Sequence, residues 1–69
     1  MQFKKYRRTN VAEMRPYIKG ENLSGVSISG SDLLHGSPKV GDMIARNPNN
    51  YDDSWLVAEK YFNDNFKEL

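Results

Sequence analysis

The fold of this chain is decided by one stretch, which reads Lys39-Val40-Gly41-Asp42-Met43-Ile44-Ala45-Arg46-Asn47-Pro48. A Gly-Asp step opens an apolar run there, and a polar Asn-Pro-Asn-Asn cluster stops it. A second apolar run at 54–58 then returns with the only tryptophan of the chain. Two short apolar runs on either side of a turn-rich segment predict a β-hairpin over residues 39–58.

The segment before the hairpin predicts a further strand near the start of the chain. Residues 11–18 alternate loosely between apolar and polar side chains, which is typical of a half-buried strand. The same residues also suit a short helix capped by Thr9 or Asn10. Pro16 would end such a helix early, and it would place a strand at the edge of its sheet. We favour the strand.

Two short elements are expected between this strand and the hairpin. Val26 and Ile28 lie two positions apart among polar residues, which predicts a strand with both side chains toward the core. Residues 31–35 predict a single helical turn, with Ser31 as its cap and Gly36 as its end.

Near the end of the chain, the apolar residues are spaced with the period of a helix. Ala58, Phe62 and Phe66 are four apart and would share one face of a helix laid over the sheet, while Trp55 is expected at the centre of the core. The sequence therefore predicts a single α+β domain over residues 1–69. Its parts are a small antiparallel sheet of three to four strands, a helical turn and a short C-terminal helix.

The length of the chain limits how it can be stabilised. Its 69 residues make one small domain, and a domain of this size buries only about 60% of the surface that its unfolded chain exposes. Cysteine is absent and there is one histidine, which excludes disulfides and thiolate metal sites. No glycine-rich nucleotide fingerprint is present, and we expect no cofactor. An aromatic core or self-association remains as the means of stabilisation.

The distribution of apolar residues bears on location. The longest apolar runs are a few residues, too short for a transmembrane helix or for the apolar part of a secretory signal. The expectation is a cytoplasmic protein without a membrane partner, in the host cytoplasm if a phage encodes it.

Charge is divided unevenly along the chain. Residues 1–19 hold six basic residues against one acid, and residues 20–69 hold four against eight. The basic start interleaves cations with aromatic residues, as nucleic-acid sites do. Its candidate nucleic-acid-binding residues are Lys4, Lys5, Tyr6, Arg7 and Arg8. We favour the alternative of an edge strand whose cations discourage aggregation, because the acidic remainder of the chain would repel nucleic acid.

Residues able to carry catalysis or bind metal are few. His35 lies near an expected helix end, where a histidine more often caps than catalyses. Asp42, Asp52 and Asp53 would offer carboxylates to a divalent cation, but their spacing matches no calcium loop and Asp is a common turn residue. We interpret all three as turn-formers and expect no enzymatic activity.

Protein binding is therefore the favoured class of function. A domain without a catalytic constellation acts through its surface, and exposed aromatic residues dominate protein interfaces. Tyr51 lies in the polar hairpin turn and is the best candidate for an exposed binding residue. The expected partner is an unknown protein or a second copy of the chain, as in a dimer.

The chain resembles small phage and prophage proteins of unknown function. The matching pieces are Tyr6-Arg7-Arg8 near the start, Gly41-Asp42-Met43-Ile44 in the middle, and Tyr61-Phe62 with Phe66 near the end. The resemblance implies a phage or prophage origin. It supplies no activity and no site residues.

Overall fold

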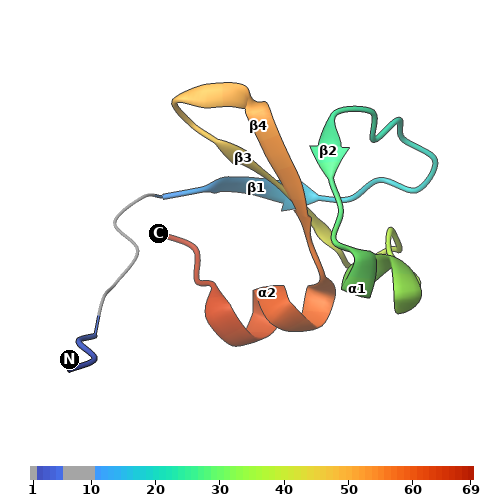
Figure 1. Cartoon of the computed structure of the whole chain (residues 1–69). Helices are drawn as coiled ribbons and strands as arrows, with labels where there is room; N and C mark the ends of the chain where they lie inside the picture. The colour runs from blue at the N-terminus through green and yellow to red at the C-terminus, as the bar shows by residue number, and fades with distance from the viewer. Residues whose placement is uncertain (1, 6–10) are drawn as a thin grey trace.

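The structure is a computed structural model, and it describes residues 2–5 and 11–69 (Figure 1). In these residues the chain forms β1 (Glu13–Pro16), β2 (Val26–Ser27), α1 (Gly30–Leu34), β3 (Met43–Asn47), β4 (Asn50–Val57) and α2 (Glu59–Asn65). The four strands make one sheet in the order β1-β3-β4-β2. Helix α2 follows β4 and runs beneath the sheet in this view, and α1 lies below β2, close to the start of α2 (Figure 1).

Strands β3 and β4 form the predicted hairpin. They pair antiparallel, with Met43 opposite Val57 and Ala45 opposite Trp55. The strands are joined at Pro48-Asn49, where the Asn47 side chain accepts a hydrogen bond from the Asn49 N–H at 2.9 Å. Asparagine side chains that bind the backbone two residues on are a common device of tight turns. The hairpin prediction is confirmed.

The remaining strands make the sheet mixed. β1 pairs antiparallel with β3, but β2 pairs parallel with β4, in a register that sets Val26 beside Ser54. The chain crosses from β1 at one edge to β2 at the other before it enters the hairpin, so β1, β2 and β4 share one direction. The α+β class is confirmed, and one pair differs from the purely antiparallel sheet that we expected.

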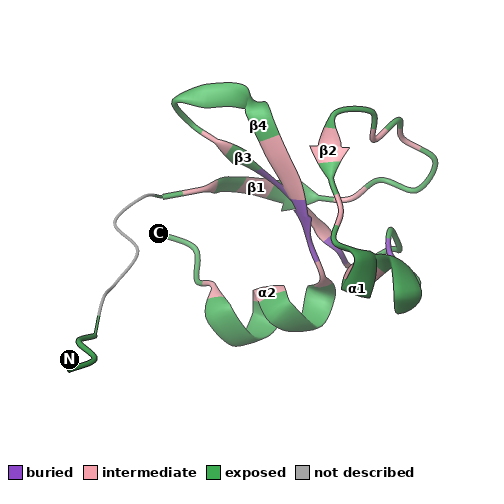
Figure 2. Cartoon of the chain, viewed as in Figure 1, coloured by how far each residue is buried: buried purple, intermediate pink, exposed green. Residues whose placement is uncertain are grey.

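The core is small and lies toward the open end of the hairpin, away from its turn. Among the described residues, the buried apolar side chains are Ile44, Ala45, Leu56 and Val57 (Figure 2). Trp55 is only half-buried, so its prediction as the centre of the core is wrong. The residue of β2 that lies beside Trp55 is Ser27, whose side chain is too small to cover an indole ring.

The cap of helix α1 lies two residues earlier than expected. Its cap is Ser29, whose Oγ accepts a hydrogen bond from the Asp32 N–H at 3.0 Å, and not Ser31. Ser29 has an extended backbone, as a cap requires, whereas Ser31 already lies inside the helix. Gly36 follows the helix with φ +96°, the conformation for which glycine was predicted there.

A buried carboxylate joins the hairpin to α2. Asp42 is fully buried and accepts hydrogen bonds from the Ser37 Oγ–H at 2.8 Å, the Lys39 N–H at 3.0 Å and the Glu59 N–H at 3.0 Å. The last of these caps α2, whose own N-cap residue is an alanine without a side-chain acceptor. The Asp42 carbonyl also accepts from the Tyr17 N–H at 2.9 Å, just beyond β1. Asp42 is thus the turn residue that was predicted, and it also fixes where α2 starts.

Candidate protein-binding groove

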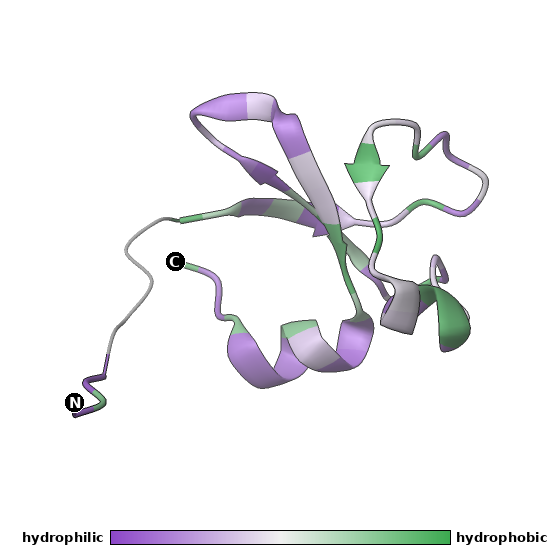
Figure 3. Cartoon of the chain, viewed as in Figure 1, coloured by the Kyte–Doolittle hydropathy of each residue, from purple (hydrophilic) through white to green (hydrophobic). Residues whose placement is uncertain are grey.

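An apolar groove of about 440 Å³ lies between α2 and the part of the sheet formed by β1 and β3. Its lining residues come from the segment before β1, from β1, β3 and α2, and from the end of the chain: Val11, Ala12, Met14, Met43, Phe62, Phe66, Lys67, Glu68 and Leu69. Seven of the nine are apolar, and the apolar positions on these segments are visible in Figure 3. We refer to these nine residues as the groove.

The two walls of the groove are apolar because of the periods of their elements. Met14 lies opposite Ala45, which is two residues from Met43 on the same strand, so both methionines project from one face of the sheet. Phe62 lies in α2 and Phe66 follows it directly, and their rings are near parallel with centroids 6.1 Å apart. The predicted C-terminal helix is confirmed, but Ala58 and Phe66 flank it with extended backbones, so Phe62 is the one residue of the predicted face that lies within the helix. Both phenylalanines are half-buried.

Two apolar side chains stand at the rim of the groove. Leu69 is 97% exposed and Val11 is 55% exposed. Figure 1 shows the residues after α2 turning back toward the segment that precedes β1, which brings the two ends of the described domain to the same side. The groove therefore combines a hollow with protruding apolar groups beside it.

The edge of β1 beside the groove is poorly suited to pairing with another strand. Because Tyr17 bonds to Asp42, the alternation of an antiparallel ladder points the backbone groups of Arg15 toward β3 and those of Met14 and Pro16 outward. Pro16 has no N–H to offer, and its carbonyl already accepts from Arg15 Nη1 at 3.2 Å. This edge presents little to a pairing strand, which leaves the groove as the more open surface.

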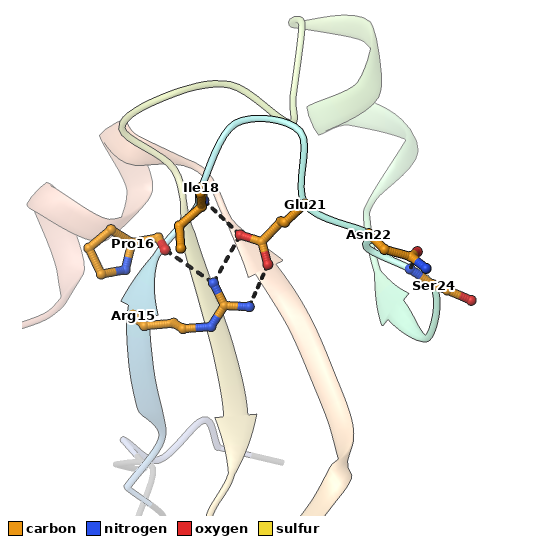
Figure 4. A network of polar contacts seen from close by, with 6 residues as sticks. All are labelled: Arg15, Pro16, Ile18, Glu21, Asn22 and Ser24. Atoms are coloured by element: carbon orange, nitrogen blue, oxygen red, sulfur yellow. Dashed lines mark hydrogen bonds and ion pairs between the residues drawn. The ribbon is translucent and has the colours of Figure 1, made fainter.

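On the opposite face of the sheet, an ion pair holds the loop that follows β1 (Figure 4). Arg15 donates to both carboxylate oxygens of Glu21, at 2.9 Å and 2.6 Å, and the Ile18 N–H donates to the same carboxylate at 2.6 Å. The hydrogen bonds from Arg15, then that from Ile18, lower the pKa of Glu21 to about 2. The same bond to Glu21 raises the pKa of Arg15.

Tyr51 is the second residue of β4, directly after the hairpin turn in which it was predicted to lie. It is 60% exposed, which confirms the expectation that it reaches solvent. The Arg46 guanidinium lies 3.8 Å from the centre of its ring, and Arg46 Nε donates to Glu13 Oε1 at 2.8 Å. One face of the ring is thus occupied by this cation, and the role of Tyr51 in binding stays a prediction.

Of the other candidate residues, those that the structure describes do not line the groove. Lys4 and Lys5 are exposed, and Tyr6, Arg7 and Arg8 lie outside the described residues. Asp52 and Asp53 are exposed residues of β4 and do not lie in the turn, so their prediction as turn-formers is wrong. The hairpin closes before them because Pro48-Asn49 already supplies the turn.

The described residues that were considered for catalysis or metal binding are not brought together into a site. His35 follows α1, with Nδ1 2.7 Å from the Ser31 carbonyl oxygen, which is a local contact at a helix end. Within residues 2–5 and 11–69, no group of three His, Asp or Glu side chains is placed to hold a metal ion.

The groove itself was not anticipated from the sequence. The spacing of Phe62 and Phe66 indicated an apolar helix face, which we expected to be buried against the sheet. The expectation failed because coverage depends on where the helix lies against β1 and β3, and no local pattern carries that information.

Neither of the described helices is long and apolar enough to cross a membrane. Comparisons of the chain with protein-family models, with curated proteins and with solved structures found no match.

Proposed function

We propose that this chain is a non-enzymatic binding protein whose interaction surface is the groove. The observation that supports the proposal is an apolar hollow walled by two methionines and two half-buried phenylalanines and left open beside exposed Leu69. Large open apolar surfaces of soluble proteins mark interaction sites, and aromatic side chains and methionine are enriched in the centres of protein interfaces. The occupant that fits is an apolar segment of a protein.

The resemblance to small phage and prophage proteins suggests where the partner would be found. A phage accessory protein would find its partner among the proteins of the phage, including itself, or of the host. Both the origin and the partner are part of the proposal.

A photocrosslinking experiment in whole cells tests the groove as a binding surface. Leu69 is replaced by the photoreactive residue benzoylphenylalanine, and Leu34, an 86% exposed residue on α1, serves as the matched control position. We expect adducts with protein, of any mass, from position 69 and none above background from position 34. Equal yields from the two positions, or no adduct from position 69, would contradict the proposal.

The second candidate function is nucleic-acid binding by residues 4–8. It is favoured by the exposure of Lys4 and Lys5, the described part of this segment, and of the neighbouring Phe3. Fluorescence anisotropy with a labelled oligonucleotide tests it, since binding through cations weakens steeply as salt rises. The variant K4A/K5A should bind more weakly with a shallower salt dependence, and a chain that binds no oligonucleotide at low salt excludes this function.

A further inference from the structure

We propose that α2 and the residues after it form a lid that opens away from the sheet as one unit while the hairpin stays folded. The lid consists of residues 59–69 and is hinged at Ala58, and the hydrogen bond from the Glu59 N–H to Asp42 fastens it. Its movement widens or closes the groove, because the lid is the wall that faces β1 and β3. This motion is a property of the chain alone and does not depend on what the groove binds.

A single hydrogen bond joins the lid to the strands and loops of the described chain. The Glu59 N–H donates to Asp42 Oδ1 at 3.0 Å. The other polar contacts of the lid among the described residues stay within 58–69, such as the ion pair from Lys60 Nζ to Asp64 Oδ2 at 2.7 Å. Opening the lid therefore breaks one hydrogen bond and leaves Asp42 with its two donors in the loop before β3.

The apolar contacts of the lid are shallow. Phe62 and Phe66 are half-buried, and the other residues of the lid are exposed. In the described part of the chain, only the paired strands approach one another closely along their length. Regions with few buried apolar contacts open at the lowest free energy, and they open as cooperative units. The lid is the helical unit of this domain that meets that description.

The helix in the lid is too short to persist when it is undocked. α2 has seven residues, and helices shorter than about 12 residues are marginal in water. Ala58 at its N-cap offers no side-chain acceptor, so the side-chain cap comes from Asp42 across the hinge. Undocking removes this cap and unwinds α2, and docking restores both. The lid thus has two states, one docked and helical and the other open and unwound.

Native-state hydrogen exchange of the purified full chain, followed residue by residue by NMR, tests the proposal. The lid amides that report on it are those of Glu59, Phe62 and Phe66, which all donate in the docked state. The hairpin amides are those of the paired residues Ala45 and Trp55. We expect the lid amides to be protected by one shared factor and to exchange at least about tenfold faster than the hairpin amides.

Two matched substitutions separate opening of the lid from unfolding of the whole domain. Ile44 is buried and alternates with Met43, so it projects from the sheet face away from the groove. I44V weakens the sheet in the docked and the open state alike, and we expect it to speed exchange of the hairpin amides by about threefold to tenfold and to leave the lid amides unchanged. F62L weakens only the docked state and should speed both sets by the same factor.

Two results would overturn the proposal. If I44V speeds the lid amides as much as the hairpin amides, α2 opens only when the whole domain unfolds. If the wild-type lid amides exchange as fast as those of an unstructured peptide, the chain has no docked state for the lid to leave.

Discussion

The buried carboxylate of Asp42 accepts hydrogen bonds from three donors, two in the loop before β3 and one at the start of α2. Removing it leaves a serine hydroxyl and two backbone N–H groups without their partner. We expect D42A to lower the free energy of unfolding by about 3 kcal/mol, the cost of unpairing buried donors from a charged acceptor. The measurement is urea unfolding followed by Trp55 fluorescence.

The exposed residue Asp53 provides the matched control for this substitution. It lies on β4, and we expect D53A to change the stability by less than about 0.5 kcal/mol. Equal losses for D42A and D53A would mean that the carboxylate of Asp42 does not hold α2 to the hairpin.

Gly41 is required for two separable reasons. Its φ is +106°, where side chains are strained, and an added Cβ would lie 2.5 Å from Glu59 Oε2. We expect G41A to cost about 2 kcal/mol and the double variant G41A/E59A to recover part of that loss, because only the steric contact is relieved. Gly30 has open space and no positive φ, so G30A should be neutral or stabilising by about 0.5 kcal/mol. A G41A variant as stable as G30A would contradict the argument.

The Gly-Asp step shows how far a single residue can be predicted from sequence. A corner at 41–42 followed from the residue types alone, since glycine and aspartate favour turns. The second role of Asp42, as the cap of a helix that starts 17 positions later, could not be predicted from the residue types. The contact exists only once the hairpin and α2 are both in place.

At the level of elements, the loop after β1 is held by an ion pair that depends on pH. The pKa of Glu21 is about 2 in the folded chain, below its ordinary value near 4.5, so the unfolded chain takes up a proton first as pH falls. The stability from Glu21 is complete above pH about 4.5 and is lost as pH falls toward about 2. The pair is exposed to solvent, so the effect is modest and weaker in high salt.

The direction of this pH dependence can be measured directly. We expect the urea midpoint of the wild type to fall between pH about 5 and about 2.5, and we expect part of that fall to be missing in E21Q. R15Q, which removes the guanidinium from the other side, should reduce the fall in the same way. If both variants keep the full wild-type pH dependence, the ion pair contributes nothing to it.

Elements that depend on local chemistry were the predictable ones. The hairpin followed from Asn47-Pro48 and its flanking apolar runs, and the C-terminal helix followed from the spacing of Phe62 and Phe66. The direction of the two-residue strand β2 could not be predicted from its own residues. Its parallel pairing with β4 results from the preceding loop, which carries the chain from one edge of the sheet to the other.

For the whole molecule, self-association through the groove would have a thermodynamic consequence. Unfolding of a dimer releases two chains, so the unfolding midpoint rises with protein concentration. We expect the thermal midpoint of the wild type and of L34D to rise over a wide concentration range and that of L69D to stay constant. A wild-type midpoint that is independent of concentration would argue against the dimer.

Whole-molecule properties were also the least predictable. The sequence favoured self-association as one means of stabilising so short a chain, and that expectation stays a prediction. The groove itself appears only when α2 is placed near β1, and these elements are separated by most of the chain.

The capping of α2 by Asp42 also bears on the order of events during synthesis. The ribosome makes the carboxylate 17 residues before it makes the amide that it caps. Until Glu59 emerges, closing the start of the hairpin around Asp42 would bury a carboxylate that lacks one of its three donors, which is unfavourable. We therefore expect the nascent chain to keep this corner hydrated, and the last helix to complete the domain in the same step that buries the acid.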